Sequence, residues 1–126
     1  MVVLMEKPTA GPPLRIEDLV FETNDISTLA ATYQDLLNLR VPNNEMWELW
    51  MLILCSSQSE SSARFKVTFG NTAPKEFSPN VRIPIYHPLP DKLQVNSGVA
   101  IKVQVKSDGA ATVRAFATLI GNKVSR

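Results

Sequence analysis

Few residues of this chain have types and spacing that could support catalysis. The sequence contains one His and one Cys. His87, in the segment Tyr86-His87-Pro88, would have to serve any Ser-His-Asp hydrolase alone, and no second His or spaced Cys joins it as a metal ligand. We therefore expect His87 to be an ordinary surface or loop histidine. Cys55 lies in an apolar run and is expected to be a small buried hydrophobe.

The acidic and glycine residues also form no recognisable catalytic or cofactor pattern. Glu45, Glu48 and Asp35 could supply a glycosidase pair, but a chain with 12 acidic residues offers many chance pairs. The five glycines are scattered singly, without the spacing of a dinucleotide or phosphate loop. The sequence therefore predicts no catalytic, cofactor-binding or metal site, no cofactor, and a protein that is not an enzyme.

Three aromatic residues are expected on outward strand positions: Trp50, Tyr86 and Phe116. Exposed rings can stack on sugars or bases, or they can anchor a protein interface. Because each ring is embedded in apolar sequence, subunit contact is favoured over ligand stacking.

Composition indicates one globular domain. The chain has 126 residues, of which 44% are hydrophobic and 20% charged, and its formal net charge is +1. So small a charge attracts neither nucleic acid nor an anionic membrane. No apolar stretch reaches the ~18–20 residues of a membrane helix.

Residues 1–13 are expected to lie outside the domain, because prolines interrupt them and proline removes backbone donors. They form either a frayed terminus or an extended arm. In the second case the apolar tip would bury itself on a neighbouring subunit; its residues are Val2, Val3, Leu4 and Met5.

From residue 14 onward, apolar residues mostly alternate with polar ones, which is typical of strands. Residues 46–55 are nearly all apolar and predict a central strand covered on both sides, with Leu49 and Met51 on one face and Trp50 and Leu52 on the other. Residues 25–37 are ambiguous, since a helical stripe overlaps an alternating pattern. We expect a turn at Asn24-Asp25, one helical turn near residues 27–30 and a strand over residues 31–41.

The remaining segments alternate with turn signals. The serine-rich residues 56–62 predict a hairpin connection, and Asp108-Gly109 predicts the turn of a second hairpin. Val81, Ile83 and Ile85 are expected to point inward around Pro84. Seven or eight strands at this spacing predict an all-β antiparallel sandwich or barrel over residues 14–126.

Four stretches resemble small virion proteins of tailed phages. In residues 37–49 (LNLRVPNNEMWEL) a strand ends in Val-Pro, a short turn follows, and the next strand begins with an aromatic residue. In residues 56–69 a polar loop precedes a regular strand. Residues 89–103 (LPDKLQVNSGVAIKV) are similar to the family's LPL-x-L-x-x-G-D-x-I-x-V segment, although Val99 replaces its usual Asp. Residues 112–119 close the domain with small residues. The resemblance spans residues 31–120 and implies a jelly-roll-like sandwich.

The same resemblance implies a non-enzymatic structural protein located in the virion: a capsid decoration or cement protein, or a head–tail accessory protein. Its expected partners are further copies of itself, with a trimer favoured, and virion proteins such as the major capsid protein. Besides the arm, the expected interface residues are Trp50, Leu52 and Tyr86.

Two other functions remain open from the residues. A carbohydrate- or receptor-binding module would use Trp50 or Tyr86 as a stacking platform. A small hydrolase or isomerase would require His87 or paired acids to line one pocket.

Overall fold

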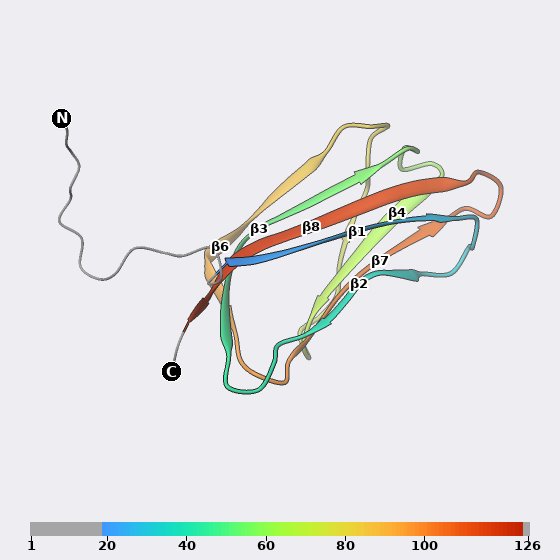
Figure 1. The fold of residues 1–126 in the computed structure, drawn as a ribbon. Coiled ribbons are helices and arrows are strands. Elements are labelled where there is room, and N and C mark those ends of the chain that lie inside the picture. The colour runs from blue at the N-terminus through green and yellow to red at the C-terminus, as the bar shows by residue number, and fades with distance from the viewer. Residues whose placement is uncertain (1–18, 125–126) are drawn as a thin grey trace, which may run out of the picture.

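The computed structural model describes residues 19–124, apart from the side chains of residues 90–92, and these residues form eight β-strands (Figure 1). The expected all-β class and number of strands are confirmed. The expected arm, residues 1–13, lies outside the described residues. The strands are β1 (Leu19–Thr28), β2 (Gln34–Arg40), β3 (Met46–Ser56), β4 (Ala63–Phe69), β5 (Lys75–Phe77), β6 (Ile85–Val95), β7 (Ala100–Ser107) and β8 (Val113–Val124).

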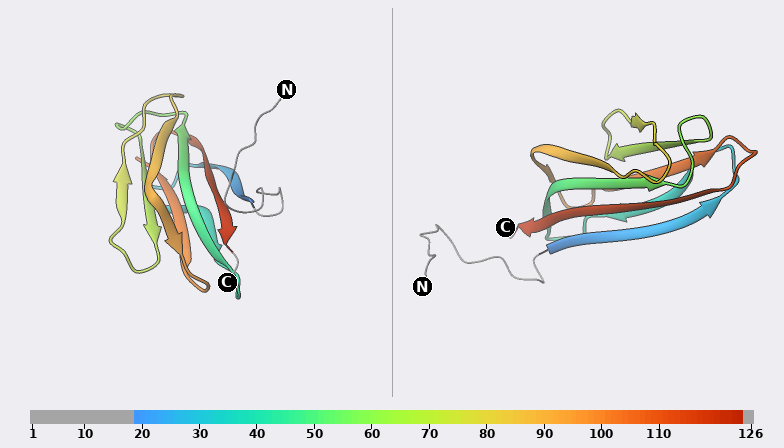
Figure 2. Two further views of the ribbon diagram at one scale, coloured as in Figure 1. Left: turned by 90° about the vertical axis from the view of Figure 1, so that its left-hand side faces the viewer. Right: turned by 90° about the horizontal axis from the view of Figure 1, so that it is seen from above.

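The strands build two four-stranded antiparallel sheets that pack face to face (Figures 1 and 2). The first sheet has the order β1-β8-β3-β6 and the second has the order β2-β7-β4-β5. Consecutive strands of the described chain lie in opposite sheets except at β4–β5, which form a hairpin. This strand order is the jelly roll, a sandwich made of two Greek keys.

Two of the expected hairpins are therefore wrong. The serine-rich loop joins β3 to β4, and the Asp108-Gly109 turn joins β7 to β8, so both cross between the sheets. Turn residues mark where the chain reverses, but they do not determine which sheet the next strand joins. Gly109 does adopt the positive φ, 91°, that the turn signal implies. The backbone amides of Ala110 and Ala111 donate to the Asp108 carboxylate and lower its pKa.

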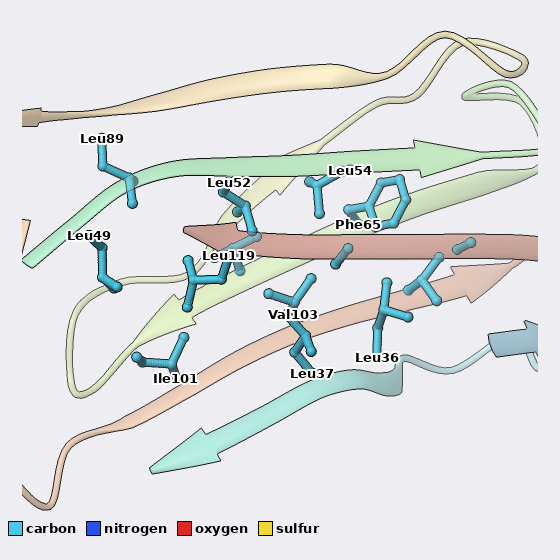
Figure 3. Packing of buried hydrophobic residues seen from close by; sticks show 14 of the residues in the cluster. Leu36, Leu37, Leu49, Leu52, Leu54, Phe65, Leu89, Ile101, Val103 and Leu119 are labelled. Atoms are coloured by element: carbon cyan, nitrogen blue, oxygen red, sulfur yellow. The ribbon is translucent and has the colours of Figure 1, made fainter. Parts of the chain in front are cut away.

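The core lies between the sheets and draws one face of every long strand into a single apolar layer (Figure 3). β4 and β8 contribute alternate residues to this layer, since Phe65, Val67 and Leu119 are buried. Phe65 is the largest fully buried side chain of the described residues. The other fully buried large side chains are Leu36, Leu49, Leu52, Leu54, Ile101, Val20, Val41, Val103, Val105, Val113 and Leu119.

A β-bulge in β3 changes which of its residues face the core. Leu49 pairs with Gly121 of β8 and Met51 pairs with the adjacent Ile120, so Trp50 is an extra residue. Because side chains alternate along a strand, one extra residue exchanges the two faces beyond it. Leu52 is consequently fully buried, and its expected place in an interface is wrong. The expected central position of this strand is confirmed, since β3 lies between β8 and β6.

Two local expectations fail where the sheet overrides local pattern. The expected turn at Asn24-Asp25 and the helical turn at residues 27–30 are wrong, because β1 runs to Thr28 and pairs residue by residue with β8. A continuous ladder satisfies backbone groups that a turn would leave unpaired. Val81 and Ile83 are exposed rather than inward, because this segment precedes β6 and contains a left-handed residue, Arg82, which breaks the alternation.

Gly121 provides the space that the bulge needs, and its replacement should destabilise the fold. A Cβ atom at this position would collide with the Glu48 carbonyl oxygen and lie 2.9 Å from the Cα of Leu49. Because both are backbone atoms, we expect Gly121→Ala to lower the free energy of unfolding by about 3 kcal/mol, the upper part of the usual range for overpacking. Urea denaturation measures this change. Gly98→Ala is the comparison for backbone strain alone: its Cβ would meet nothing within 4 Å, but its φ of 83° disfavours any side chain and should cost about 1 kcal/mol. A loss at Gly121 no larger than the loss at Gly98 would contradict the steric explanation.

Candidate functional site: an apolar sheet face

The outer face of the first sheet carries a row of apolar side chains across all four strands. Phe21 of β1 lies opposite Ile120 of β8, which lies opposite Met51 of β3, which in turn lies opposite Pro88 of β6. Directly opposed residues in a sheet point to the same face. Phe21 is 61% exposed, although its directly opposed partner, Ile120, is apolar.

Two further rows on one side extend this surface, whereas the row on the other side is polar apart from Leu19, with Asn122, Glu48 and Gln94. Ile53 of β3 lies opposite Tyr86 of β6, whose side chain is 63% exposed, and the next row places Phe116 of β8 opposite Cys55. The row of Ile53 continues through Thr118 of β8 to Thr23 of β1. The row of Phe116 ends at Asp25 of β1, the one carboxylate in these two rows. We call this surface the apolar face; it comprises Leu19, Phe21, Trp50, Met51, Ile53, Cys55, Tyr86, Pro88, Phe116 and Ile120.

Two of the expected interface residues, Trp50 and Tyr86, lie on the apolar face, and the third, Leu52, lies in the core. Trp50 lies half-buried at the bulge, and its indole N–H donates to the Asn122 side-chain oxygen at 2.9 Å. Tyr86 projects from β6 to solvent, as expected. Leu52 lies one residue beyond Met51 and faces the core instead. Residues 2–5, the expected tip of the arm, fall outside the described part of the chain.

Sequence reasoning missed most of the apolar face. Phe21, Met51, Ile53 and Ile120 come from three strands that are distant in the sequence, and only the pairing of β1, β8 and β3 brings them together. A strict period of two places Met51 on the face of Leu49, because it ignores the bulge. The apolar alternation of residues 19 and 21 was the local signal that could have identified the start of this surface.

The outer face of the second sheet is charged. Lys66 of β4 lies opposite Gln104 of β7 and Glu76 of β5, and Arg64 pairs with Glu76 at 3.3 Å. The ammonium groups of Lys66 and Lys106 lie 4.7 and 4.8 Å from the centre of the Tyr33 ring. The two outer surfaces of the sandwich therefore differ in kind. The outward residues of the second sheet include Asp35, Asn38, Arg40, Arg64, Lys66, Thr68, Glu76, Lys102, Gln104 and Lys106.

His87 is not the surface or loop residue that the sequence suggested. It lies in β6 opposite the buried Leu52, half-buried, and its ring meets the edge of Phe77 at a centroid distance of 5.0 Å. The surrounding hollow, about 220 Å³, is lined by apolar side chains and Lys75 besides His87. Burial lowers the pKa of His87 below its ordinary value, and the Lys75 ammonium lowers it further. Its described neighbours offer no carboxylate to orient the imidazole for acid–base chemistry.

Cys55 differs from its expected role as well. It is half-buried on the apolar face, not enclosed in the core, because the bulge turns it outward. No group of three or more His, Cys, Asp or Glu side chains gathers into a metal-binding cluster among residues 19–124. The same part of the chain contains no helix with the length and hydropathy needed to cross a membrane.

Comparison with protein-family models, with curated proteins and with solved structures finds no match for this chain.

His87 should make the fold less stable as the pH falls. The folded state favours the neutral imidazole, so the unfolded state binds more protons between the lowered pKa and the ordinary value near 6.5. The stabilisation that comes from the neutral imidazole is thus fully present above a pH equal to the ordinary pKa. It is lost as the pH falls toward the lowered pKa of the folded state. We expect His87→Gln, which cannot titrate, to show a flatter dependence of the urea midpoint between about pH 7 and 5. An unchanged slope would contradict the assignment.

Proposed function

We propose that this chain is a non-enzymatic structural protein of a virion, either a capsid decoration or cement protein or a head–tail accessory protein. It assembles as a symmetric oligomer and docks on other virion proteins such as the major capsid protein. The observation that carries the proposal is the apolar face, a continuous hydrophobic surface on the outside of an otherwise complete sandwich.

The size of the apolar face favours a covered surface. An aromatic side chain carries about 150–250 Å², so Phe21 and Tyr86, at 61% and 63% exposure, leave roughly 200–300 Å² of ring surface in contact with water. Leu19 and Phe116 are exposed on the same face. With them the exposed apolar area approaches the roughly 300–600 Å² of the largest patch on a typical monomer, and such patches are often functional. These side chains point away from the core between the sheets, so we infer that they contact another molecule.

The jelly roll is compatible with this role but does not select it. Viral capsid domains, lectins and cupins share the architecture, and a fold by itself does not imply a function. A cupin-type enzyme needs a cluster of metal ligands, and none gathers among the residues that the structure describes. The resemblance of residues 31–120 to phage virion proteins points the same way as the apolar face.

A carbohydrate- or receptor-binding module is the second candidate, and the exposed ring of Tyr86 favours it. Sugar sites combine a ring with polar groups that bind hydroxyls. The row of Tyr86 offers apolar Ile53 and then two threonines, Thr118 and Thr23, whose hydroxyls bond to each other at 3.0 Å. Stacking on a sugar would depend on Tyr86, whereas docking on a shell would depend on the whole face.

Substitutions on the apolar face separate these two functions. We expect Tyr86→Ser and Ile53→Ser each to weaken binding to shells of the major capsid protein about tenfold, because truncating a central apolar anchor costs about 1–2 kcal/mol. Co-sedimentation with shells measures the affinity. Lys102→Ser, on the charged face of the second sheet, is the matched control and should change nothing.

Two outcomes of this binding experiment would contradict docking through the apolar face. Equal shell binding by all three variants would refute the proposed face. Binding to a glycan panel that Tyr86→Ser abolishes and Ile53→Ser leaves intact would establish the carbohydrate-binding function instead.

The N-terminal arm supplies a second proposed contact. Val2, Val3, Leu4 and Met5 would bury their side chains on a neighbouring subunit, and extended backbone there would add main-chain hydrogen bonds. We expect deletion of residues 1–13 to weaken attachment to the shell without lowering the thermal midpoint of the sandwich. Attachment at full strength after the deletion would refute the latch.

A further inference from the structure

The sandwich ends in four edge strands, which are β1 and β6 in the first sheet and β2 and β5 in the second. An edge strand presents a row of unpaired N–H and C=O groups that can pair with another chain. Proteins protect such edges by prolines, bulges, short strands or charged side chains, above all Lys and charges that point inward. The four edges of this sandwich differ in that protection.

Two edges on one side of the sandwich are blocked. β5 has three residues, too few to guide a long partner. β6 contains Pro88 and Pro90, which lack the N–H donor, and its pairing with β3 skips from Leu93 to Pro88. Neither strand offers a continuous row of hydrogen-bonding groups.

The edge of β2 is interrupted as well. Its register with β7 shifts between Asp35 and Leu37, which makes Leu36 a bulge residue. The Asn24 side-chain amide of β1 donates to the Leu36 carbonyl oxygen at 2.9 Å, so this edge group is already bonded. A strand approaching β2 would meet both an irregular spacing and an occupied acceptor.

β1 has the fewest of these protections, since its only charges are the carboxylates of Glu22 and Asp25. All ten of its residues pair with β8 in an unbroken register, and the strand contains no Pro, Lys or Arg. Figure 2 shows β1 (blue) along the border of the first sheet, beside β8. Half of the backbone groups of β1 point away from β8, because donors and acceptors alternate sides along an antiparallel strand. Among the described strands, β1 is therefore the edge best suited to receive another strand.

We propose that β1 pairs with β1 of a second copy of this chain, antiparallel, around a two-fold axis that passes beside Thr23. The two first sheets then form one eight-stranded sheet. In this register Val20 lies opposite Ile26 on the inner face, and Glu22 lies opposite Asn24. Phe21 lies opposite Asp25 on the outer face.

The neighbouring registers are worse. A shift of two residues one way places Glu22 opposite its own copy, and like charges directly opposite destabilise a sheet. A shift of two residues the other way places Ile26 opposite Glu22 and separates it from Val20. The register centred on Thr23 keeps the carboxylates apart and preserves the apolar pair.

This contact would close on itself. Once both β1 strands are paired, the edges that remain are the interrupted ones of β2, β5 and β6, so growth into a fibre stops at the dimer. The contact also joins two apolar faces edge to edge, because Leu19 and Phe21 lie on the paired strand. In this respect the inference deepens the proposed function, since the dimer would present a doubled docking surface.

Charge substitutions at the axis test the pairing. The full chain should sediment as a species of twice 14.0 kDa at high concentration. Thr23→Lys and Thr23→Glu each place like charges opposite one another and should raise the dimer dissociation constant about fivefold. An equimolar mixture of the two variants should recover the dimer, because Lys then faces Glu.

Thr118→Lys is the matched control. Thr118 lies in the same row, one strand from the edge, and its hydroxyl bonds to that of Thr23 at 3.0 Å, so both Lys variants lose the same hydrogen bond. We expect it to dimerise like the unmodified chain. Circular dichroism checks that all variants keep their strands.

Hydrogen exchange gives a readout without substitution. Outward-facing amides of β1 should exchange quickly in dilute solution and several-fold more slowly in the dimer, whereas amides of β6 should not respond to concentration. Slow exchange of β1 at dilutions where the chain sediments as a monomer would show that something other than a second copy covers the edge, which would overturn the inference.

Three further results would overturn it: a monomer at every concentration up to about 1 mM, a trimer insensitive to Thr23→Lys, or equal losses in Thr23→Lys and Thr118→Lys. None of these would affect shell binding that depends on Tyr86 and Ile53, so the docking part of the proposed function would stand. Conversely, a β1 dimer that fails to bind shells would refute the proposed docking alone.

Discussion

One extra residue in β3 decides which surface this sandwich shows to its surroundings. Trp50 has no partner in the ladder with β8, so the residues before and after it alternate out of phase. Leu52 and Leu54 therefore enter the core, while Met51, Ile53 and Cys55 turn outward. Gly121 makes the arrangement possible, because the backbone of β3 approaches it too closely for any side chain. A regular strand with the same sequence would have filled the core with the other set of residues.

The jelly-roll order converts this local change into a difference between whole surfaces. β3 lies in the middle of the first sheet, so its outward apolar residues join those of β8, β1 and β6 into one face. The second sheet keeps charged side chains on its outside and needs no cover. The edges are unequal too, since β1 alone among the described strands offers a long and regular edge. The apolar face and the open edge therefore lie on the same sheet.

Residue patterns reach the fold class but not this surface. Alternation and turn residues predict an all-β sandwich, and the alternation over residues 64–69 and 113–119 agrees with the burial of Phe65 and Leu119. They fail at Leu52, because a bulge depends on the pairing of three strands and leaves no mark in a run where every residue is apolar. They fail also at the connections, since a turn at Asp108-Gly109 is compatible with either a hairpin or a crossing between sheets. The exposed positions of Tyr86 and Phe116 could be predicted from the sequence. That both residues lie on the same face of one sheet could not, because this depends on the pairing of the strands.

Cys55 allows the central claim to be tested on the unmodified protein. It is the only cysteine of the chain and lies on the apolar face, half-exposed and opposite Phe116. The rate at which iodoacetamide alkylates its thiol should fall at least about tenfold when the chain binds its shell, because a desolvated interface excludes the reagent. The same rate in the free and the bound protein would contradict the account, since the apolar face would then remain in contact with water throughout.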